Sequence, residues 1–308
     1  MSDERATAEA KRESTADPVA GEPATPAPIS CVVCSASDSR PVFREFGVDV
    51  VRCRKCGHVH STYRTPQDYD GYFGEDVPRD DQFWWDAAHR RMYEAFARRF
   101  LRGRRGRLLD MGCGLGYFVR FAAAIPGWEA HGSEISRAAV DYAADVLGLE
   151  SIACGRVQDA GFPAHHFDVI TLWDVIEHVA APDPLLGHLA TILRDDGFLF
   201  FHTPNIQVQL PKARLKRLLF GMRPEKHYLE ARDHMNIYAP RTLERVLRRN
   251  GFEKVEFVHL PPVQSIAGSR GVLSRAVKNA WYDAARLLHA ATLGRVNRDN
   301  LFVVARKG

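Results

Sequence analysis

Residues 108–118 read Leu-Leu-Asp-Met-Gly-Cys-Gly-Leu-Gly-Tyr-Phe, an apolar pair followed by three glycines at alternate positions. The apolar pair predicts a buried strand, and the spacing of Phe118, Phe121 and Ala122 predicts a helix after the glycines. Glycine allows a positive φ and a close approach of the backbone to a ligand, and the first turn of a helix directs free N–H groups to the same place. The stretch therefore predicts a cradle for a nucleotide-type cofactor.

The spacing of the glycines distinguishes two classes of cofactor. The dinucleotide fingerprint needs its third glycine three places after the second, whereas Gly116 follows Gly114 by two places. With Asp110 before the turn, the pattern D-x-G-x-G-x-G resembles the first motif of class I S-adenosylmethionine (SAM) methyltransferases. The resemblance implies that Asp110 faces the methionine amino group and that Gly112, Cys113, Gly114 and Gly116 admit the amino-acid end of SAM. NAD and a turn without any ligand are the alternatives.

Two later stretches extend this resemblance. Residues 129–134 predict a second strand that ends in Glu134, where a carboxylate accepts hydrogen bonds from both ribose hydroxyls in NAD and SAM folds alike. Residues 167–179 read Phe-Asp-Val-Ile-Thr-Leu-Trp-Asp-Val-Ile-Glu-His-Val, a pattern similar to the fourth strand and following turn of the same methyltransferases. The family pattern implies further cofactor-binding residues at Ile135, Asp159, Ala160, Trp173 and Asp174.

Length and composition set the broad class. The chain has 308 residues, of which 45% are hydrophobic, which is ample for a sizeable core. A net charge of +4 does not by itself indicate a nucleic-acid partner. No apolar run approaches the length of a membrane span and the N-terminus has no apolar signal core, so we expect a cytoplasmic protein. Residues 1–28 are rich in Ala, Glu, Thr and Pro and predict a disordered tail.

Four of the six cysteines form two C-x-x-C pairs, Cys31 with Cys34 and Cys53 with Cys56. Two such pairs about twenty residues apart bring four thiolates to one tetrahedral Zn²⁺, which predicts a zinc ribbon over residues 29–62. A shell of four cysteines leaves no position open for water, so we interpret the zinc as structural. A redox dithiol and a degenerate site are the alternatives.

The rest of the chain predicts a connector at 63–82 and a methyltransferase domain at 83–308. Short apolar runs alternate with helical stretches, which predicts an α/β fold with a parallel sheet. The resemblance implies a Rossmann-like sheet of seven strands with helices on both faces. An insertion at about 206–233 carries an apolar stripe among basic residues, which suits a solvated surface, a lid over an anionic substrate or a membrane-surface patch. A second insertion at about 262–298 carries a longer apolar stripe, which suits packing on its own domain, the seam of a homodimer or a peripheral membrane contact.

The turn after the fourth strand bears on the methyl acceptor. Methyltransferases that act on planar amino groups often carry Asn/Asp-Pro-Pro-Tyr/Phe here, whereas residues 173–176 read Trp-Asp-Val-Ile, which favours oxygen or carbon acceptors. A hydroxyl acceptor calls for a base, and histidine is suited to this role because its pKa lies near neutrality. His178 and His234 are the two candidates, with packing roles as the alternative for each.

The chain is similar to methyltransferases related to the ubiquinone-pathway enzymes, including versions that accompany surface-glycan and natural-product biosynthesis. This resemblance implies O-methylation, or C-methylation as a weaker candidate, of a small-molecule, sugar or lipid-linked acceptor. One alternative is an RNA methyltransferase whose ribbon grips nucleic acid. It is disfavoured by the modest charge and by the missing Pro-Pro-aromatic turn. A scaffold that binds SAM without catalysis is a further alternative.

Overall fold

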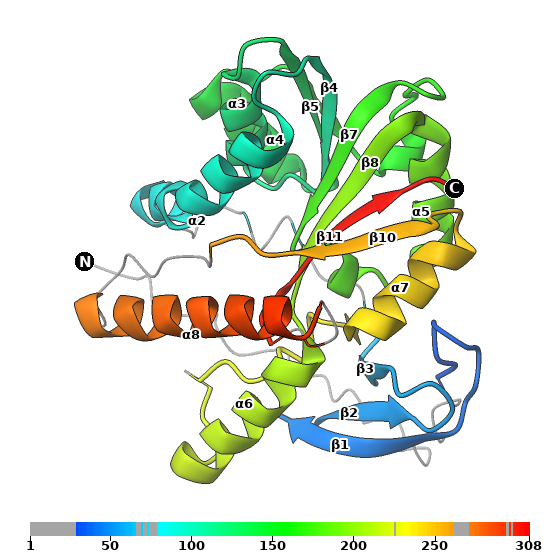
Figure 1. Ribbon diagram of the computed structural model, residues 1–308, viewed down its shortest axis with the longest axis vertical. Helices are drawn as coiled ribbons and strands as arrows, with labels where there is room; N and C mark the ends of the chain where they lie inside the picture. The colour runs from blue at the N-terminus through cyan, green and yellow to red at the C-terminus, as the bar shows by residue number, and fades with distance from the viewer. Residues whose placement is uncertain are drawn as a thin grey trace, which may run out of the picture.

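A computed structural model of the protein describes residues 29–65, 69, 73, 79–224, 226–261, 271–293, 296 and 298–308. Its central feature is a seven-stranded sheet of order β10-β11-β8-β7-β4-β5-β6 (Figure 1). The strands are β4 (Gly106–Met111), β5 (Trp128–Glu134), β6 (Ile152–Cys154), β7 (Phe167–Trp173), β8 (Leu193–Thr203), β10 (Lys254–Val258) and β11 (Leu301–Arg306). Only β11 runs antiparallel to both of its neighbours, β8 and β10. The predicted Rossmann-like sheet of seven strands is confirmed. The tail predicted at 1–28 lies outside the described residues.

Successive residues of the central strands alternate between two apolar layers, as buried parallel strands require. Leu108 and Val169 belong to one core cluster and Leu109 and Ile170 to the other. The first layer packs against α2 (Arg79–Phe100) and α3 (Tyr117–Ala123), and the second packs against α5 (Pro182–Ile192) and α7 (Pro240–Arg249). The chain continues from β5 into α4 (Arg137–Leu147), which contacts β5 and β6. Parallel strands thus share one carboxyl edge, where ligands bind in such folds.

The cysteine-rich segment forms a second, smaller sheet. Its strands are β1 (Ser39–Glu45), β2 (Val48–Cys53) and β3 (Val59–Ser61), and its fourth strand is β9 (Asn236–Ile237), which comes from the methyltransferase region. Cys31, Val33 and Cys53 are buried in the same core cluster as the apolar face of α7. The ribbon and the methyltransferase region therefore share a sheet and a core, an arrangement that the sequence did not predict.

Each predicted insertion contains a helix with exposed apolar side chains. In α6 (Ile206–Phe220), Leu218 is 81% exposed and Leu219 is 62% exposed. In α8 (Gly271–Ala291), Leu287 is 64% exposed. Figure 1 shows α6 running away from the edge of the central sheet, with α8 above it. Within the described residues, no helix is both long and apolar enough to cross a membrane.

One boundary differs from the sequence prediction. Helix α2 begins at Arg79, inside the segment 63–82 that the sequence predicts as a connector. The first four residues of the helix read Arg-Asp-Asp-Gln and offer no apolar periodicity to detect.

Candidate functional site

The three glycines after β4 all adopt positive φ, at 69° for Gly112, 51° for Gly114 and 80° for Gly116. A Cβ on Gly112 would lie 2.8 Å from Val175 Cγ2, and a Cβ on Gly116 would lie 2.9 Å from the side chain of Leu149. Both conformation and space therefore require glycine, and the turn leads directly into α3. This is the backbone geometry that the sequence predicted for a cofactor cradle.

Two carboxylates flank the cradle. Glu134 accepts hydrogen bonds from the N–H groups of Gly114, at 2.8 Å, and Ser136, at 3.0 Å, which ties the end of β5 to the glycine turn. Asp110 is 2% exposed and accepts a hydrogen bond of 2.7 Å from the Thr171 hydroxyl. Burial, together with the charge of Glu134, raises the pKa of Asp110 to about 8. A cation beside Asp110 would reverse this effect, as the ammonium group of a bound amino acid would do.

The remaining residues implied for SAM binding follow neighbouring strands at the same edge. Ile135 comes directly after β5 and is 52% exposed. Asp159 is exposed at the end of the short 3₁₀ helix η1 (Val157–Asp159), with Ala160 half-buried after it. The thiol of Cys113 lies beside β5, because a Cβ on Gly132 would come within 2.7 Å of its sulfur. The structure thus brings these residues to one edge, as parallel strand ends dictate.

Trp173 and Asp174 end β7 in different environments. The Trp173 ring packs among aromatic rings, with centroid distances of 5.0 Å to Phe118 and 4.9 Å to Phe200. Asp174 has a φ of 52°, and its carboxylate accepts a hydrogen bond of 2.9 Å from His202 Nδ1. Burial raises the pKa of Asp174, but the charge and hydrogen bond of His202 outweigh it and hold that pKa below its usual value. The structure therefore places the half-buried Trp173 ring against the core, and it places Asp174 in a hydrogen-bonded pair with His202.

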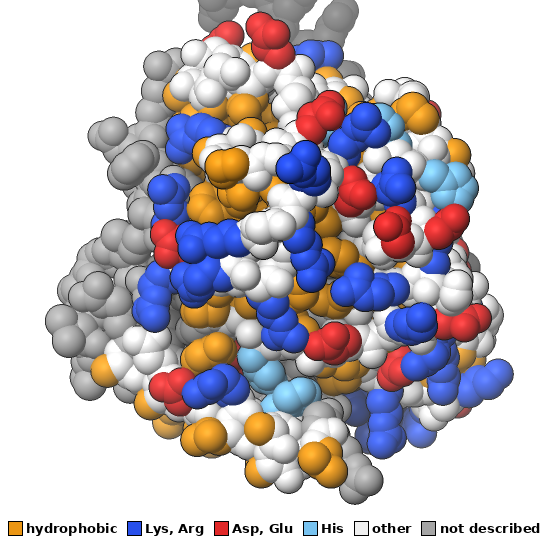
Figure 2. All heavy atoms as spheres, turned by 45° about the horizontal axis from the view of Figure 1, so that its top comes forward, with side chains coloured by type: hydrophobic (Ala, Val, Ile, Leu, Met, Phe, Trp, Pro, Cys, Tyr) orange, Lys and Arg blue, Asp and Glu red, His pale blue; other side chains and the backbone are white. Residues whose placement is uncertain are grey.

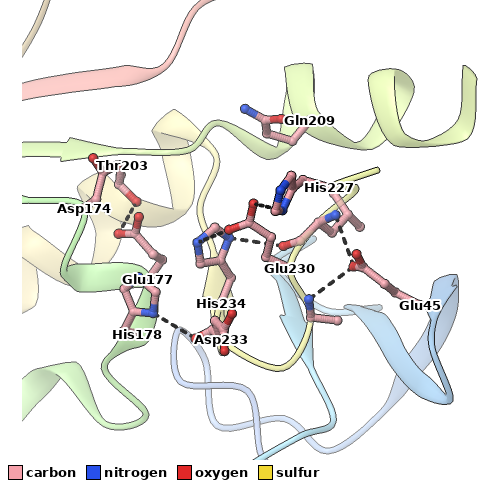
Figure 3. A network of polar contacts seen from close by, with 12 residues as sticks. Glu45, Asp174, Glu177, His178, Thr203, Gln209, His227, Glu230, Asp233 and His234 are labelled. Carbon is pink, nitrogen blue, oxygen red and sulfur yellow. Dashed lines mark hydrogen bonds and ion pairs between the residues drawn. The ribbon is translucent and has the colours of Figure 1, made fainter. Parts of the chain in front are cut away.

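His178 and His234 come together, although they lie on segments far apart in the sequence. Their ring centroids are 5.0 Å apart. His178 Nδ1–H donates to the backbone oxygen of Asp233 at 3.0 Å, and His234 Nδ1–H donates to that of Leu229 at 3.1 Å (Figure 3). Burial lowers the pKa of His178 to about 4 and also lowers that of His234. Both rings are therefore neutral at pH 7. Nε2 of His178 is left as a potential acceptor or ligand atom, whereas Nε2 of His234 lies 3.4 Å from a carboxylate oxygen of Glu230.

Glu177 lies beside this histidine pair. One carboxylate oxygen accepts a hydrogen bond of 2.8 Å from Thr203, while Oε1 is buried with no partner among the described residues. Burial raises the pKa of Glu177 well above its usual value. One ligand atom from each of Glu177, His178 and His234 lies within 4.8 Å of the others. Two imidazoles and a carboxylate form a donor set for a divalent cation, and an unpartnered buried oxygen fits such an ion.

The four cysteines of the ribbon also converge. The sulfur atoms of Cys31 and Cys56, and those of Cys34 and Cys53, are 3.5 Å apart, too far for a disulfide. All four sulfur atoms lie within 4.8 Å of one another. Four ligands about 2.3 Å from a central zinc ion would lie at similar separations. The geometry thus fits the tetrahedral site that the spacing predicted.

Several site residues were missing from the sequence prediction. His202 lies at the end of β8, and its second ring nitrogen contacts the side-chain amide of Asn300 at 3.2 Å. Glu45, in the ribbon, contacts the backbone of the segment that carries His234. These contacts span 98 and more than 180 residues, so no local motif signals them. The only usable hint was that β8 ends in polar residues at the ligand edge.

Comparison with known proteins supports the interpretation of the fold. Residues 84–257 match the family described as methyltransferase domain. A ubiquinone biosynthesis O-methyltransferase of Neisseria meningitidis serogroup C is 30% identical over 160 residues, which cover 50% of this chain and 65% of that enzyme. One of Parvibaculum lavamentivorans is 36% identical over 103 residues, covering 32% of this chain and 40% of that enzyme. The chain thus spans less than two thirds of the relatives that it matches.

Among solved structures, a Haemonchus contortus phosphoethanolamine N-methyltransferase 2 in complex with S-adenosyl-L-methionine superposes with a TM-score of 0.50 at 14% identity. The match covers 81% of this chain and 62% of that one. A complex of the Haloferax volcanii Trm112 activator and a methyltransferase gives a TM-score of 0.52 at 14% identity, covering 80% and 100%. At such identities these structures support the fold alone. With a family match over more than half of its length, the chain belongs to the methyltransferase-domain family, with the class I SAM-dependent methyltransferase fold.

Proposed function

We propose that this protein transfers the methyl group of SAM to a hydroxyl oxygen of a small-molecule, sugar or lipid-linked acceptor. The observation that carries the proposal is the half-buried pair of neutral histidines, His178 and His234, beyond the carboxyl end of β7. The names of the relatives, which are ubiquinone biosynthesis O-methyltransferases, agree with an oxygen acceptor. C-methylation remains the second candidate reaction.

In the proposed reaction, the glycine turn, Asp110 and Glu134 hold SAM. The acceptor oxygen attacks the methyl carbon, the carbon–sulfur bond breaks, and its electron pair stays on sulfur to give S-adenosylhomocysteine. The hydroxyl proton passes to Nε2 of His178 or His234, whose Nδ1–H groups are already committed to backbone oxygens. Holding the acceptor in line with the sulfonium methyl supplies much of the rate in such a transfer.

The same residues suit a second way of activating the hydroxyl. A divalent cation held by Glu177, His178 and His234 would lower the pKa of an acceptor hydroxyl bound to it. Such an ion would also keep Glu177 ionised, which accounts for a buried carboxylate oxygen without a partner in the described residues. Dialysis against EDTA distinguishes the two modes, because a cation-dependent enzyme loses turnover and regains it with Mg²⁺ or Mn²⁺, whereas a histidine base keeps working.

We also propose that Cys31, Cys34, Cys53 and Cys56 hold a structural zinc ion. The convergence of their sulfur atoms supports this assignment. Burial raises the pKa of the Cys31 thiol, because the charged thiolate loses its hydration. A bound zinc ion would offset this cost of ionisation by binding the thiolate form of the cysteines. With all four ligands supplied by the protein, the ion has no open position for the reaction.

The RNA methyltransferase is the less favoured alternative. Figure 2 shows Lys and Arg side chains spread over one face, with Asp and Glu side chains among them and hydrophobic side chains between them. Binding to a phosphate backbone favours a strip of basic residues without acidic ones. The buried contacts between the ribbon and the methyltransferase region also leave less of the ribbon free to grip a nucleic acid.

The proposal is tested by methyl transfer from labelled SAM into a lysate of the native host, separated into organic, aqueous small-molecule and nucleic-acid fractions. We expect label in one of the first two fractions. His178→Asn and His234→Asn should each lower the rate about a hundredfold or more if the ring accepts the proton, with SAM affinity unchanged. His165→Asn, on an exposed ring, is the matched control. Label in the nucleic-acid fraction would contradict the proposal.

A further inference from the structure

Residues 227–235, here called the acceptor segment, form the last part of the connection from α6 to β9 and contact both histidines of the pair. The backbone oxygens of Leu229 and Asp233 accept the hydrogen bonds that orient His234 and His178. Glu230 has a φ of 57° and lies 3.4 Å from His234 Nε2. The positions of both rings therefore depend on the backbone path of one irregular segment.

The ribbon holds this segment through a buried carboxylate. Glu45 is 5% exposed and ends β1, directly before the hairpin turn formed by Phe46 and Gly47. Its Oε2 accepts hydrogen bonds from the N–H groups of Leu229 and Ala231, both at 3.1 Å (Figure 3). These two amides flank Glu230, so the carboxylate fixes the backbone on both sides of the residue with positive φ.

Further contacts bind the segment to the same sheet. The Ser61 hydroxyl donates to the Ala231 oxygen, and the Ser61 N–H donates to the Met235 oxygen at 3.1 Å. Strand β3 then pairs with β9, and His58 contacts the Asn236 side chain at 3.2 Å. The acceptor segment is thus fastened to the ribbon at its middle and at its end.

We propose that the zinc ribbon is the frame of the methyl-acceptor site, and that Glu45 is a positioning residue that holds the acceptor segment and, through it, His178 and His234. The proposal rests on the proposed function for the role of the two histidines, but the placement of the segment does not. The charge of a buried carboxylate is best satisfied by N–H donors, and here the donors come from the segment itself.

Hydrogen exchange in the zinc-loaded protein tests the placement without any acceptor. In Glu45→Ala, exchange at the Leu229 and Ala231 amides should be about tenfold faster or more, since both lose their partner. A peptide covering 106–118, zinc stoichiometry and SAM affinity should stay unchanged. Asp49→Ala removes a half-exposed acid of the same hairpin and is the matched control. The proposal would be overturned if exchange became equally faster in the acceptor segment and in the peptide covering 106–118. It would also be overturned if exchange in the acceptor segment did not change.

Two conservative variants distinguish the effect of side-chain length at position 45 from the effect of its charge. They remain informative if Glu45→Ala does not fold. Glu45→Gln keeps an oxygen at the same reach, so we expect slow exchange in the segment. Glu45→Asp keeps the charge but is one methylene short, so we expect fast exchange and a raised KM for the lysate fraction that accepts label, at an unchanged Kd for SAM. The reverse order of the two variants contradicts the proposal. A protein without methyl transfer would end the proposed function and leave the exchange result standing.

Discussion

Asp110 should make SAM affinity depend on pH. Its pKa is raised to about 8 by burial in the absence of ligand, and pairing with the cofactor ammonium requires the ionised form. The ionised fraction falls about tenfold for each pH unit below that pKa, so the Kd for SAM should rise about tenfold per unit from pH 8 to pH 6. Above pH 8 the Kd should rise again, because the α-amino group of SAM, with an ordinary pKa of about 8, loses its proton. Titration calorimetry across this range measures the dependence.

Asp110→Asn is the control for this profile, because it keeps the ligand's own ionisation and removes that of the carboxyl group. We expect weaker binding with a flatter pH dependence. Parallel profiles for the two proteins would show that Asp110 does not pair with the cofactor.

Gly112 offers a test of close approach in the cradle. In Gly112→Ala, the new Cβ meets Val175 Cγ2 at 2.8 Å and the backbone keeps a positive φ, so we expect a loss of about 1–3 kcal/mol in unfolding free energy and weakened SAM binding. Gly148→Ala is the matched control, because its φ of 67° is similar but no atom lies within 4 Å. Urea unfolding and SAM titration measure both variants. Equal effects in the two variants would assign the loss to backbone strain alone.

The sequence revealed those site residues that belong to a local motif, and it missed residues whose role depends on distant contacts. Gly112, Gly114 and the cysteine pairs carry their spacing in the sequence, and the structure places them as expected. Asp174 was found, but its partner His202 was not, because the two residues meet only through the pairing of β7 with β8 across the crossover that contains α5. Glu45 was not predicted either, because its hydrogen-bond partners are distant in the sequence. An acidic residue at a strand end also usually faces solvent.

Helices α6 and α8 carry most of the strongly exposed apolar side chains among the residues that the structure describes. Leu218 and Leu219 lie on α6 among Lys212, Arg214 and Arg217, and this combination suits the surface of an anionic membrane. We expect the protein to cosediment with vesicles containing phosphatidylglycerol and not with neutral phosphatidylcholine vesicles. Leu218→Ser with Leu219→Ser should lower the partition constant for the vesicles about a hundredfold or more, because each buried leucine contributes about 1.5–3 kcal/mol.

Val146→Ser is the matched control for the vesicle experiment, because it removes an exposed apolar side chain from α4 instead. Binding that is absent in the original protein, or unchanged in the α6 variant, would exclude this surface as a lipid contact. Light scattering on the same samples identifies the other candidate, a homodimer seam, by a doubled mass.

At the level of elements, hydrophobic periodicity and turn chemistry predicted most of the central sheet. Strand β7 was readable because both of its faces are buried, which gives a continuous apolar run. Strand β9 has only two residues and was invisible to any pattern, since its existence depends on pairing with β3. The link between ribbon and methyltransferase region therefore had to come from the structure.

The whole molecule should unfold as one unit, because the ribbon and the central sheet share a core. Cys31, Val33 and Cys53 pack in the same cluster as α5, α7 and the strands, and Arg249 on α7 donates to the backbone oxygens of Val32 and Val33. All five tryptophans lie outside the ribbon, at positions 84, 85, 128, 173 and 281. Their fluorescence therefore reports the methyltransferase region, whereas zinc release to a colorimetric chelator reports the ribbon.

In urea, we expect zinc release and tryptophan fluorescence to have coincident midpoints, as a two-state transition requires. Added SAM should shift both midpoints upward together, because a ligand that binds only the native state stabilises everything that unfolds with its site. Zinc release at a lower urea concentration, with fluorescence unchanged, would instead describe the ribbon as a separately folding module. Early zinc release would contradict the proposal that the ribbon frames the methyl-acceptor site. A shift of both midpoints with SAM would instead show that cofactor binding stabilises the zinc site through the common core.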